Sequence, residues 1–247
     1  MTFTEEVNAG ALVFCNHSGG KDSQAMYLHL REVVPTDQLI IIHADLGDLV
    51  EWSGVKEHIR ANIDGRKLEI AHAYYRDGSS KDLLGYVRKR GKWPSNANRF
   101  CTSDLKRDPI GREIKRIMKE RGATRAINCM GLRAEESPNR AKKLPWQLNE
   151  RLTVNKRVHR TVWDCNPILH MKEHEVYAAI AAAGQEVHWA YKAGMNRLSC
   201  SFCVLAGKND LRTAAKLRPD LLQTYLDLEQ EIGHTFQNKR TLAEITA

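Results

Sequence analysis

A six-residue turn, Ser-Gly-Gly-Lys-Asp-Ser at residues 18–23, constrains the fold of this chain most. It follows an apolar segment at 11–15 that has the composition of a buried strand, and it precedes a helical pattern. Two adjacent glycines let the backbone turn sharply between the strand and the helix. The turn therefore predicts a strand, a tight loop and a helix in direct succession, with the free N–H groups of the helix at the loop.

The same alternation continues along the chain. Short apolar segments separated by helix-length spacers recur at 11–15, 38–43, 67–72, 125–130 and 161–165. Strands that alternate with helices favour a parallel sheet because each crossover needs a long connection. We therefore predict an α/β fold with a doubly wound, Rossmann-like sheet of about five parallel strands.

Helical patterns fill several of the remaining segments. One is expected to open at Asp108, acting as its cap, with Pro109 in the first turn and an apolar stripe that includes Ile114 and Ile117. Others are expected at 173–183 and at 209–232, the latter interrupted by Pro219.

The remaining organisation is predicted from composition. The polar, basic segment 137–159 contains two prolines and is expected to form a mobile excursion over the surface. We predict a nucleotide-binding domain at 1–205 and a carboxy-terminal helical extension at 206–247.

The turn has the residue types that a polyphosphate requires. Backbone N–H groups at Gly19 and Gly20 can approach phosphate oxygens, and Lys21 supplies countercharge. Asp22 is a candidate ligand for Mg²⁺, and the hydroxyls of Ser18 and Ser23 can donate hydrogen bonds. The sequence is not a Walker A loop, because Asp22 follows Lys21 where Ser or Thr would be needed, and it contains no G-x-G-x-x-G fingerprint.

These residues match known motifs. The turn resembles the S-G-G-x-D-S loop of the N-type ATP pyrophosphatases, the PP-loop group. Other segments resemble the phosphoadenylyl-sulfate (PAPS) reductase-like branch of that group: a C-x-x-x-L-K-x-x-P segment beginning at Cys101, a G-x-R-x-x-E-S-x-x-R segment beginning at Gly131, and a turn at 45–47 similar to D-T-G. The resemblance spans residues 11–205.

The resemblance implies roles for individual residues. Asp45 and Gly47 are expected near the ribose and adenine, and Gly131 is expected in the nucleotide site. Arg133 and Arg140 are expected to contact phosphates, where guanidinium groups would stabilise charge as the bond between the α and β phosphorus atoms breaks. Lys21, Asp22, Arg133 and Arg140 are thus the candidate catalytic residues. Glu136 is expected to orient one of the arginines.

Members of that branch that make sulfite use a cysteine in a carboxy-terminal motif. No cysteine follows Cys203 in this sequence. Sulfonucleotide reduction through that thiol is therefore not expected.

Four of the six cysteines are candidate metal ligands. Cys200 and Cys203 form a C-x-x-C pair, Cys101 corresponds to a ligand of cluster-bearing relatives, and Cys165 is the candidate fourth ligand. The alternatives are a [4Fe-4S] cluster, a Zn²⁺ ion, a three-cysteine site with one open iron, or reduced thiols without metal. Cys15 and Cys129 lie in apolar strand patterns and are expected in the core.

Positive charge is concentrated in one region. Residues 85–160 carry 21 Lys and Arg against 7 Asp and Glu, in a chain of net charge +8. This surplus favours a polyanionic partner, a nucleic acid or a nucleoprotein complex such as an anti-phage or CRISPR accessory assembly. No apolar run reaches about 18 residues and no export signal is recognisable. We expect a soluble, cytoplasmic protein with no membrane partner.

The predicted function is ATP α-hydrolysis: Mg²⁺-ATP binds at 18–23, and attack on the α-phosphorus gives pyrophosphate with AMP or an adenylated intermediate. That intermediate would serve sulfur chemistry on a nucleic acid. Two alternatives stay open, binding or reduction of a sulfonucleotide with an external thiol, and a non-catalytic nucleotide-binding subunit with a structural zinc site.

Overall fold

A computed structural model describes residues 1–154 and 159–247. The chain separates into two compact units, each built from three segments. The first comprises Met1–His43, Lys56–Ala71 and Ile110–Val187, and the second comprises Ala44–Val55, His72–Pro109 and His188–Ala247. The predicted boundary between residues 205 and 206 remains a prediction.

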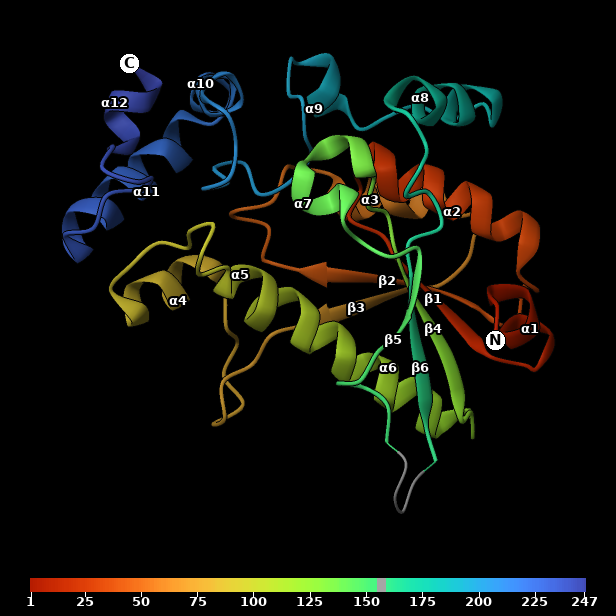
Figure 1. Ribbon diagram of the computed structural model, residues 1–247. Helices are drawn as coiled ribbons and strands as arrows, with labels where there is room; N and C mark the ends of the chain where they lie inside the picture. Colours follow the sequence, from red (N-terminus) through yellow and green to blue (C-terminus); the bar gives the residue numbers. More distant parts are fainter. Residues whose placement is uncertain (155–158) are drawn as a thin grey trace. The chain divides into compact units, whose positions relative to one another are not determined.

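The first unit is built on a six-stranded sheet of order β3-β2-β1-β4-β6-β5 (Figure 1). Strand β1 pairs parallel with β2 and with β4, and β4 pairs parallel with β6, whereas β5 pairs antiparallel with β6. The strands are β1 (Leu12–Asn16), β2 (Leu39–Asp45), β3 (Leu68–His72), β4 (Arg125–Met130), β5 (Trp146–Leu148) and β6 (Thr161–Cys165). The five predicted strands and the doubly wound fold are confirmed.

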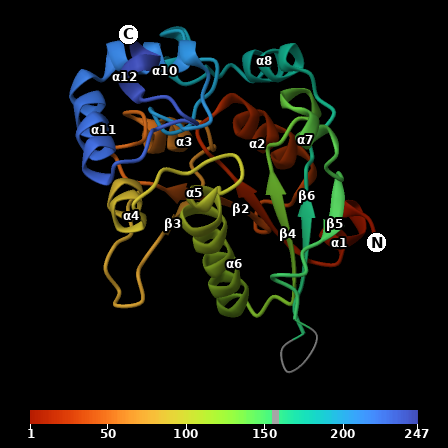
Figure 2. The same cartoon turned by 60° about the vertical axis from the view of Figure 1, so that its left-hand side comes forward.

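The strand order reverses direction at β1. From β1 the chain proceeds outward to β2 and β3 on one side, and the later strands β4 and β6 are added on the other. Loops after two strands that diverge in this way leave a crevice at the carboxyl edge of the sheet, where α/β proteins bind their ligands. In Figure 2 the arrows of β4 and β6 point toward the end of the sheet where α7 (Pro138–Ala141) lies.

Helices cover both faces of this sheet. On one face, α6 (Asp108–Glu120) packs Ile114, Ile117 and Met118 against Leu12 and Phe14 of β1 (Figures 1 and 2). The spacing of these three residues places them on one side of the helix, which buries the stripe and leaves the charged side in solvent. The opposite face carries α2 (Lys21–Val33) and α8 (Glu173–Ala182). The unit also contains α1 (Phe3–Asn8), α3 (Val55–Ala61) and the 3₁₀ turn η2 (Ala134–Glu136).

A row of polar side chains crosses the α6 side of the sheet. Asn16 donates a hydrogen bond to Asn128 at 2.8 Å, and Asn128 donates to the Asp164 carboxylate at 2.7 Å. Asn149 donates to the same carboxylate oxygen at 2.8 Å. Because these groups satisfy one another across β1, β4 and β6, they favour one register of the strands.

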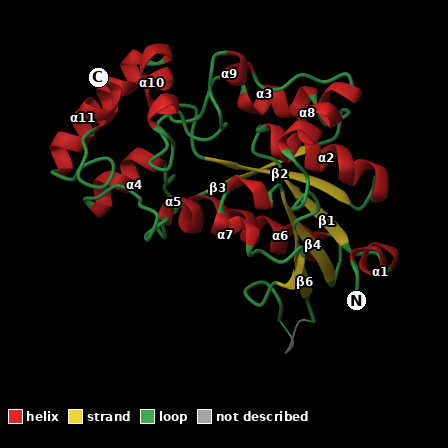
Figure 3. Cartoon of the chain, turned by 45° about the horizontal axis from the view of Figure 1, so that its top comes forward, coloured by secondary structure: helices red, strands yellow, loops and turns green. Residues whose placement is uncertain are grey.

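The second unit consists mainly of helices and loops, as the colours of Figure 3 show. Its centre is aromatic: Trp93 stacks on Tyr225 with ring centroids 5.2 Å apart, and Phe236 and Phe202 pack against Tyr225. The predicted helix at 209–232 is confirmed with its break at Pro219. The helices are α4 (Leu83–Arg90), α5 (Phe100–Thr102), the π-helical turn η1 (Ser103–Arg107), α9 (Trp189–Lys192), α10 (Lys208–Leu217), α11 (Pro219–Ile232) and α12 (Leu242–Thr246).

One local prediction was wrong. Asp108 does not cap α6, because the π-helical turn η1 leads into it and Asp108 itself has helical torsion angles. The excursion predicted at 137–159 contains α7 and the edge strand β5, whose Trp146 stacks on Trp163 of β6 with ring centroids 5.1 Å apart. Residues 155–158 of that segment lie outside the described residues.

Candidate functional site

The predicted phosphate loop lies at the carboxyl end of β1, at the point where the strand order reverses. Gly19 has φ +77°, which is favourable for glycine, and Gly20 precedes the first residue of α2, Lys21. No side chain caps this helix end. The amino terminus of α2 therefore presents backbone donors and a partial positive charge where a phosphate is predicted to bind.

Two serines and a histidine hold the loop in this shape. The Ser23 hydroxyl accepts from the Ser18 N–H at 3.1 Å and donates to the Gly20 carbonyl at 2.8 Å. The Gly19 N–H donates to Nδ1 of His17 at 3.1 Å. Ser18 and Ser23 thus contact each other and the loop backbone, so the structure shows them as parts of the loop's support.

His17 is a neutral imidazole in this arrangement. Burial, together with the nearby His43 and His58, lowers the pKa of His17 to about 3. Its Nδ1 accepts from Gly19, which a protonated ring could not do.

Gly131 brings the end of β4 against the start of α2. A Cβ at this position would lie 3.0 Å from the Asp22 carbonyl oxygen and 3.0 Å from Cα of Ser23, a tighter contact than side chains usually make with backbone. The absence of a side chain therefore allows the segment after β4 to approach the phosphate loop. Arg133 follows two residues later.

A buried cluster of charges joins these two segments. Nε of Arg133 donates to Asp22 at 2.5 Å, and its NH1 donates to Glu135 at 2.6 Å. Nζ of Lys21 lies 3.2 Å from Asp22 and 3.2 Å from Glu173. Both cations are only 3% exposed. Burial by itself lowers the pKa of Arg133, but Asp22 and Glu135 raise it above its usual value, so the guanidinium stays charged.

The charge of this cluster bears on what it can bind. Two cations face three carboxylates, so a polyphosphate must either displace a carboxylate or bring a metal ion. Asp22 touches both cations and is the carboxylate that would hold Mg²⁺ together with phosphate oxygens, the arrangement this ion usually adopts.

Arg140 and Glu136 form a second pair beside the cluster. Glu136 forms an ion pair with Arg140 and accepts the backbone N–H of Arg133 at 3.0 Å. The expectation that Glu136 orients an arginine is confirmed by these contacts.

Asp45 and Gly47 belong to the second unit. The Gly47 N–H donates to the Asp45 carboxylate at 2.8 Å, and Gly47 has φ +95°, so the two residues form a tight turn after β2. Asp45 also lies 3.6 Å from Nδ1 of His72. Their predicted role at the ribose and adenine stays a prediction.

Three of the four predicted cysteine ligands lie in the second unit. Cys200 is buried, and Cys101 and Cys203 are half-buried. The neighbouring Cys200 thiol, the Leu205 N–H and Lys106 lower the pKa of Cys203, whereas burial opposes them. Burial by itself lowers the pKa of Lys106, but the neighbouring thiol groups and Glu51 raise it.

Cys165, the fourth predicted ligand, belongs to the first unit and not to the second. It lies in β6 of the first unit, in register with Cys129, which is in register with Cys15 of β1. This row across the sheet is buried, as expected for Cys15 and Cys129. Over residues 1–154 and 159–247, no group of three or more His, Cys, Asp or Glu side chains is placed to hold a metal ion. The role of the four cysteines as metal ligands stays a prediction, and we derive no step through iron or zinc.

The predicted basic region is partly neutralised by internal pairs. Carboxylates from outside 85–160 pair with two of its arginines: Arg116 contacts Glu69 at 3.3 Å, and Arg125 contacts the buried Glu6 at 3.1 Å. The net surplus of the sequence therefore overstates the charge available to a partner. In the part of the chain that the structure describes, no helix has both the length and the apolar surface needed to cross a bilayer.

Sequence reasoning missed four residues of these two clusters: His17, Glu135, Glu173 and Lys106. Glu135 stood inside a recognised motif and Lys106 inside another, but nothing in the sequence indicated their partners. Glu173 opens α8, which lies 150 or more residues from the loop it contacts.

One protein family and one curated protein are similar to this chain in sequence. The family described as the phosphoadenosine phosphosulfate reductase domain matches residues 13–206. A curated relative, an uncharacterized 37.8 kDa protein of Escherichia phage 186, is 29% identical over 163 residues, covering 66% of this chain and 45% of the relative. The chain thus spans less than half of that relative's length.

Two solved structures are similar in fold. PAPS reductase from Candida auris, determined as a phosphate complex, has a TM-score of 0.48 and 16% identity, over 80% of this chain and 87% of the other. FMN adenylyltransferase from Candida glabrata, determined with FMN and an ATP analogue, has a TM-score of 0.45 and 12% identity, over 77% of this chain and 54% of the other.

Proposed function

Because this chain belongs to the phosphoadenosine phosphosulfate reductase domain family, we propose that it is a PP-loop enzyme that cleaves ATP between the α and β phosphates. The observation that carries the proposal is the contact of Lys21 and Arg133 with Asp22 at the start of α2. Two buried cations at a helix amino terminus can pair with phosphate oxygens, and the carboxylate between them can hold Mg²⁺.

In the proposed reaction, the loop binds the β and γ phosphates. The N–H group of Gly20 and the Lys21 ammonium hold the phosphate oxygens, and Asp22 would hold Mg²⁺, which neutralises part of their charge. Binding replaces the contacts of Lys21 with Glu173 and of Arg133 with Glu135 by contacts with phosphate. The cations thereby exchange one set of anionic partners for another and stay compensated while buried.

Bond cleavage follows from this placement. An oxygen nucleophile attacks the α-phosphorus, the bond from that phosphorus to the bridging oxygen breaks, and pyrophosphate leaves with the electron pair. Lys21 and Arg133 stabilise the charge that develops on pyrophosphate. Arg140, held by Glu136, is proposed to contact the α-phosphate, and Asp45 and Gly47 are proposed to contact the ribose and adenine.

The acceptor decides the other product. Water gives AMP, whereas an oxygen of a nucleic acid gives an adenylated intermediate that sulfur chemistry could consume. We propose the nucleic acid as acceptor on the basis of the positive surplus in 85–160, and the proposed anti-phage role rests on that acceptor.

The test incubates the full chain with Mg²⁺ and ATP labelled at the α-phosphate, with and without RNA or DNA. AMP or a labelled nucleic acid supports the proposal, whereas labelled ADP contradicts it. Lys21→Ala and Arg133→Gln should each lower turnover at least about a hundredfold, as expected for groups that stabilise transition-state charge. Lys119→Ala, an exposed lysine on α6, is the matched control and should leave turnover unchanged.

A second candidate is favoured by the family description: binding of a sulfonucleotide. Adenylyl sulfate and ATP should be compared by calorimetry on the same sample. Tighter binding of adenylyl sulfate, without AMP formation from ATP, would favour this candidate. Binding of ATP without turnover would favour a non-catalytic subunit.

A further inference from the structure

Three cations of the second unit lie on the faces of three aromatic rings. Nζ of Lys89 lies 4.3 Å from the ring centroid of Tyr75, and Nζ of Lys81 lies 4.9 Å from the same centroid. Lys81 also lies 4.7 Å from the ring centroid of Tyr86. The guanidinium carbon of Arg90 lies 5.3 Å from the Tyr86 centroid and 4.6 Å from the centroid of the third ring. Cations and rings thus alternate in one cation–aromatic row, whose members are Lys89, Tyr75, Lys81, Tyr86, Arg90 and Phe100.

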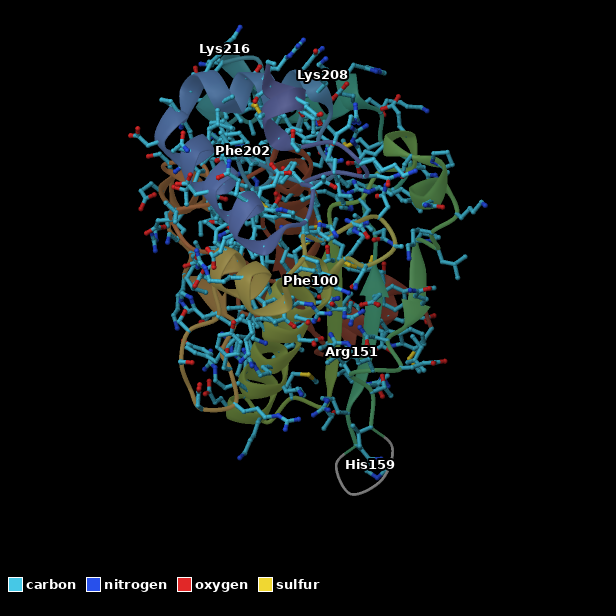
Figure 4. All side chains as sticks on the ribbon, turned by 90° about the vertical axis from the view of Figure 1, so that its left-hand side faces the viewer. Phe100, Arg151, His159, Phe202, Lys208 and Lys216 are labelled. Carbon is cyan, nitrogen blue, oxygen red and sulfur yellow. The ribbon has the colours of Figure 1, made fainter. Side chains whose placement is uncertain are left out.

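Backbone hydrogen bonds and burial hold this row in place. Tyr75 and Lys81 lie on the two arms of a hairpin, where the Tyr75 N–H donates to the Ser79 carbonyl at 2.9 Å and the Lys81 N–H donates to the Ala73 carbonyl at 2.9 Å. The other two cations and the second ring belong to α4. Phe100 opens α5 and is labelled in Figure 4, and it is only 2% exposed. The rings therefore form a fixed support beneath the cations.

The neighbouring carboxylates leave most of the positive charge of the row in place. Asp77 and Asp82 accept hydrogen bonds from backbone N–H groups two and three residues further along the chain, at 2.9 and 2.8 Å. Asp104 accepts from the Tyr86 hydroxyl at 2.6 Å and lies 3.9 Å from Arg90. In the part of the chain that the structure describes, neither lysine of the row forms an ion pair. An aromatic face attracts a cation without cancelling its charge, so the row stays positive.

Solvent reaches this charge, and an open ring lies near it in the chain. Residues 74–92 carry six Lys and Arg against two Asp and Glu. Lys89 and Arg90 are exposed and Lys81 is half-buried. Tyr74, on the same hairpin as Tyr75, is 47% exposed. The hairpin and α4 therefore present cations together with an accessible aromatic ring.

We propose that this surface binds a single-stranded nucleic acid, with the three cations of the row on backbone phosphates and Tyr74 stacked on an unpaired base. Positive surfaces bind the phosphate backbone whatever its base sequence. An unpaired base gains from contact with an exposed ring, whereas the bases of a duplex are already stacked on one another. This inference names the surface that would hold the acceptor of the proposed function, and it rests on that function for its place in the reaction.

The first experiment measures binding of a fluorescein-labelled oligodeoxythymidine to the full chain by anisotropy, without ATP, over a range of salt concentrations. Lys81→Gln combined with Lys89→Gln should weaken binding about fivefold at low salt. The slope of log K against log[salt] should become shallower by about 1.4, because each lost phosphate contact of a single strand accounts for about 0.7.

A matched control removes the same charge from another part of the unit. Lys208→Gln combined with Lys216→Gln, at exposed positions of α10 away from the row, should change neither the affinity nor the slope (Figure 4).

A second set of variants tests the rings. Tyr75→Leu keeps both lysines but removes the face on which they lie, so binding should weaken about threefold with an unchanged salt slope. Tyr75→Phe keeps the ring and should bind as the native chain does. Tyr74→Ala should weaken binding of the single strand about tenfold and leave binding of a duplex of the same length unchanged.

Four results would overturn the proposal. They are no binding of the labelled strand at low salt, equal weakening by the lysine pair of the row and by the α10 control, tighter binding of the duplex than of the single strand without any effect of Tyr74→Ala, and binding to anionic lipid vesicles in place of the strand.

These results are separate from the test of ATP cleavage, because the binding assay contains no ATP. A chain that forms AMP from ATP but does not bind the strand contradicts this inference alone. A chain that binds the strand through the row but forms neither AMP nor a labelled nucleic acid contradicts the proposed function alone.

Discussion

His17 connects the stability of this protein to pH through the phosphate loop. Its pKa is lowered to about 3 in the folded chain, mainly by burial, against about 6.5 for an exposed histidine. Between pH 6.5 and about pH 3, His17 therefore binds a proton in the unfolded chain but not in the folded chain. The contribution of His17 to the free energy of unfolding is fully present above pH 6.5, and it is lost as the pH falls from 6.5 toward 3.

The magnitude follows from the two pKa values. Each pH unit below 6.5 is worth about 1.4 kcal/mol, so a change from pH 7 to about pH 4.5 should remove about 2.5 kcal/mol of unfolding free energy through His17 alone. His17→Asn is the informative variant, because the amide oxygen can accept the Gly19 N–H in place of Nδ1 and the amide does not titrate.

The assay is urea unfolding of both proteins at the two pH values. The unfolding free energy of the native sequence should fall by about 2.5 kcal/mol more than that of His17→Asn, since other titrating groups are common to both. His17→Leu, which removes the acceptor, should also lose acid sensitivity but bind ATP more weakly. A difference below about 1 kcal/mol between the native chain and His17→Asn would refute the buried, neutral histidine.

Three further predictions concern packing and charge. Gly131→Ala should weaken ATP binding at least about tenfold in calorimetry and cost about 1–3 kcal/mol, because its Cβ would press on the backbone of Asp22 and Ser23; unchanged affinity would contradict the close approach. Asp164→Ala should lower the unfolding free energy by about 2–3 kcal/mol because it strands the amides of Asn128 and Asn149, and a loss under about 0.5 kcal/mol would refute that network. Arg88→Ala breaks only an exposed pair with Glu231, so it should cost less than about 1 kcal/mol, and less still at high salt.

The cysteines separate what local pattern can predict from what it cannot. The C-x-x-C spacing by itself sets Cys200 and Cys203 three residues apart in one loop of the second unit. Cys165, the candidate fourth ligand, ends β6 of the first unit. The pairing of β6 with β4 sets it in a row with Cys129, and register is a property of two strands that neither sequence contains alone.

The charge cluster shows the same division. The Gly-Gly turn, Lys21 and Asp22 were recognisable as a phosphate loop because strand, turn and helix are contiguous in the chain. The contact of Arg133 with Asp22 joins residues 111 positions apart, and it depends on the pairing of β1 with β4 and on the missing side chain of Gly131.

The sequence by itself determined the strands, most of the helices and the phosphate turn, because hydrophobic periodicity, glycine and proline act over a few residues. Only the tertiary structure decided which carboxylates hold Lys21 and Arg133, where Cys165 lies, and how three separate segments build the second unit. Those outcomes depend on burial and on pairing between distant segments, where the cost of an unpaired buried charge selects the partner.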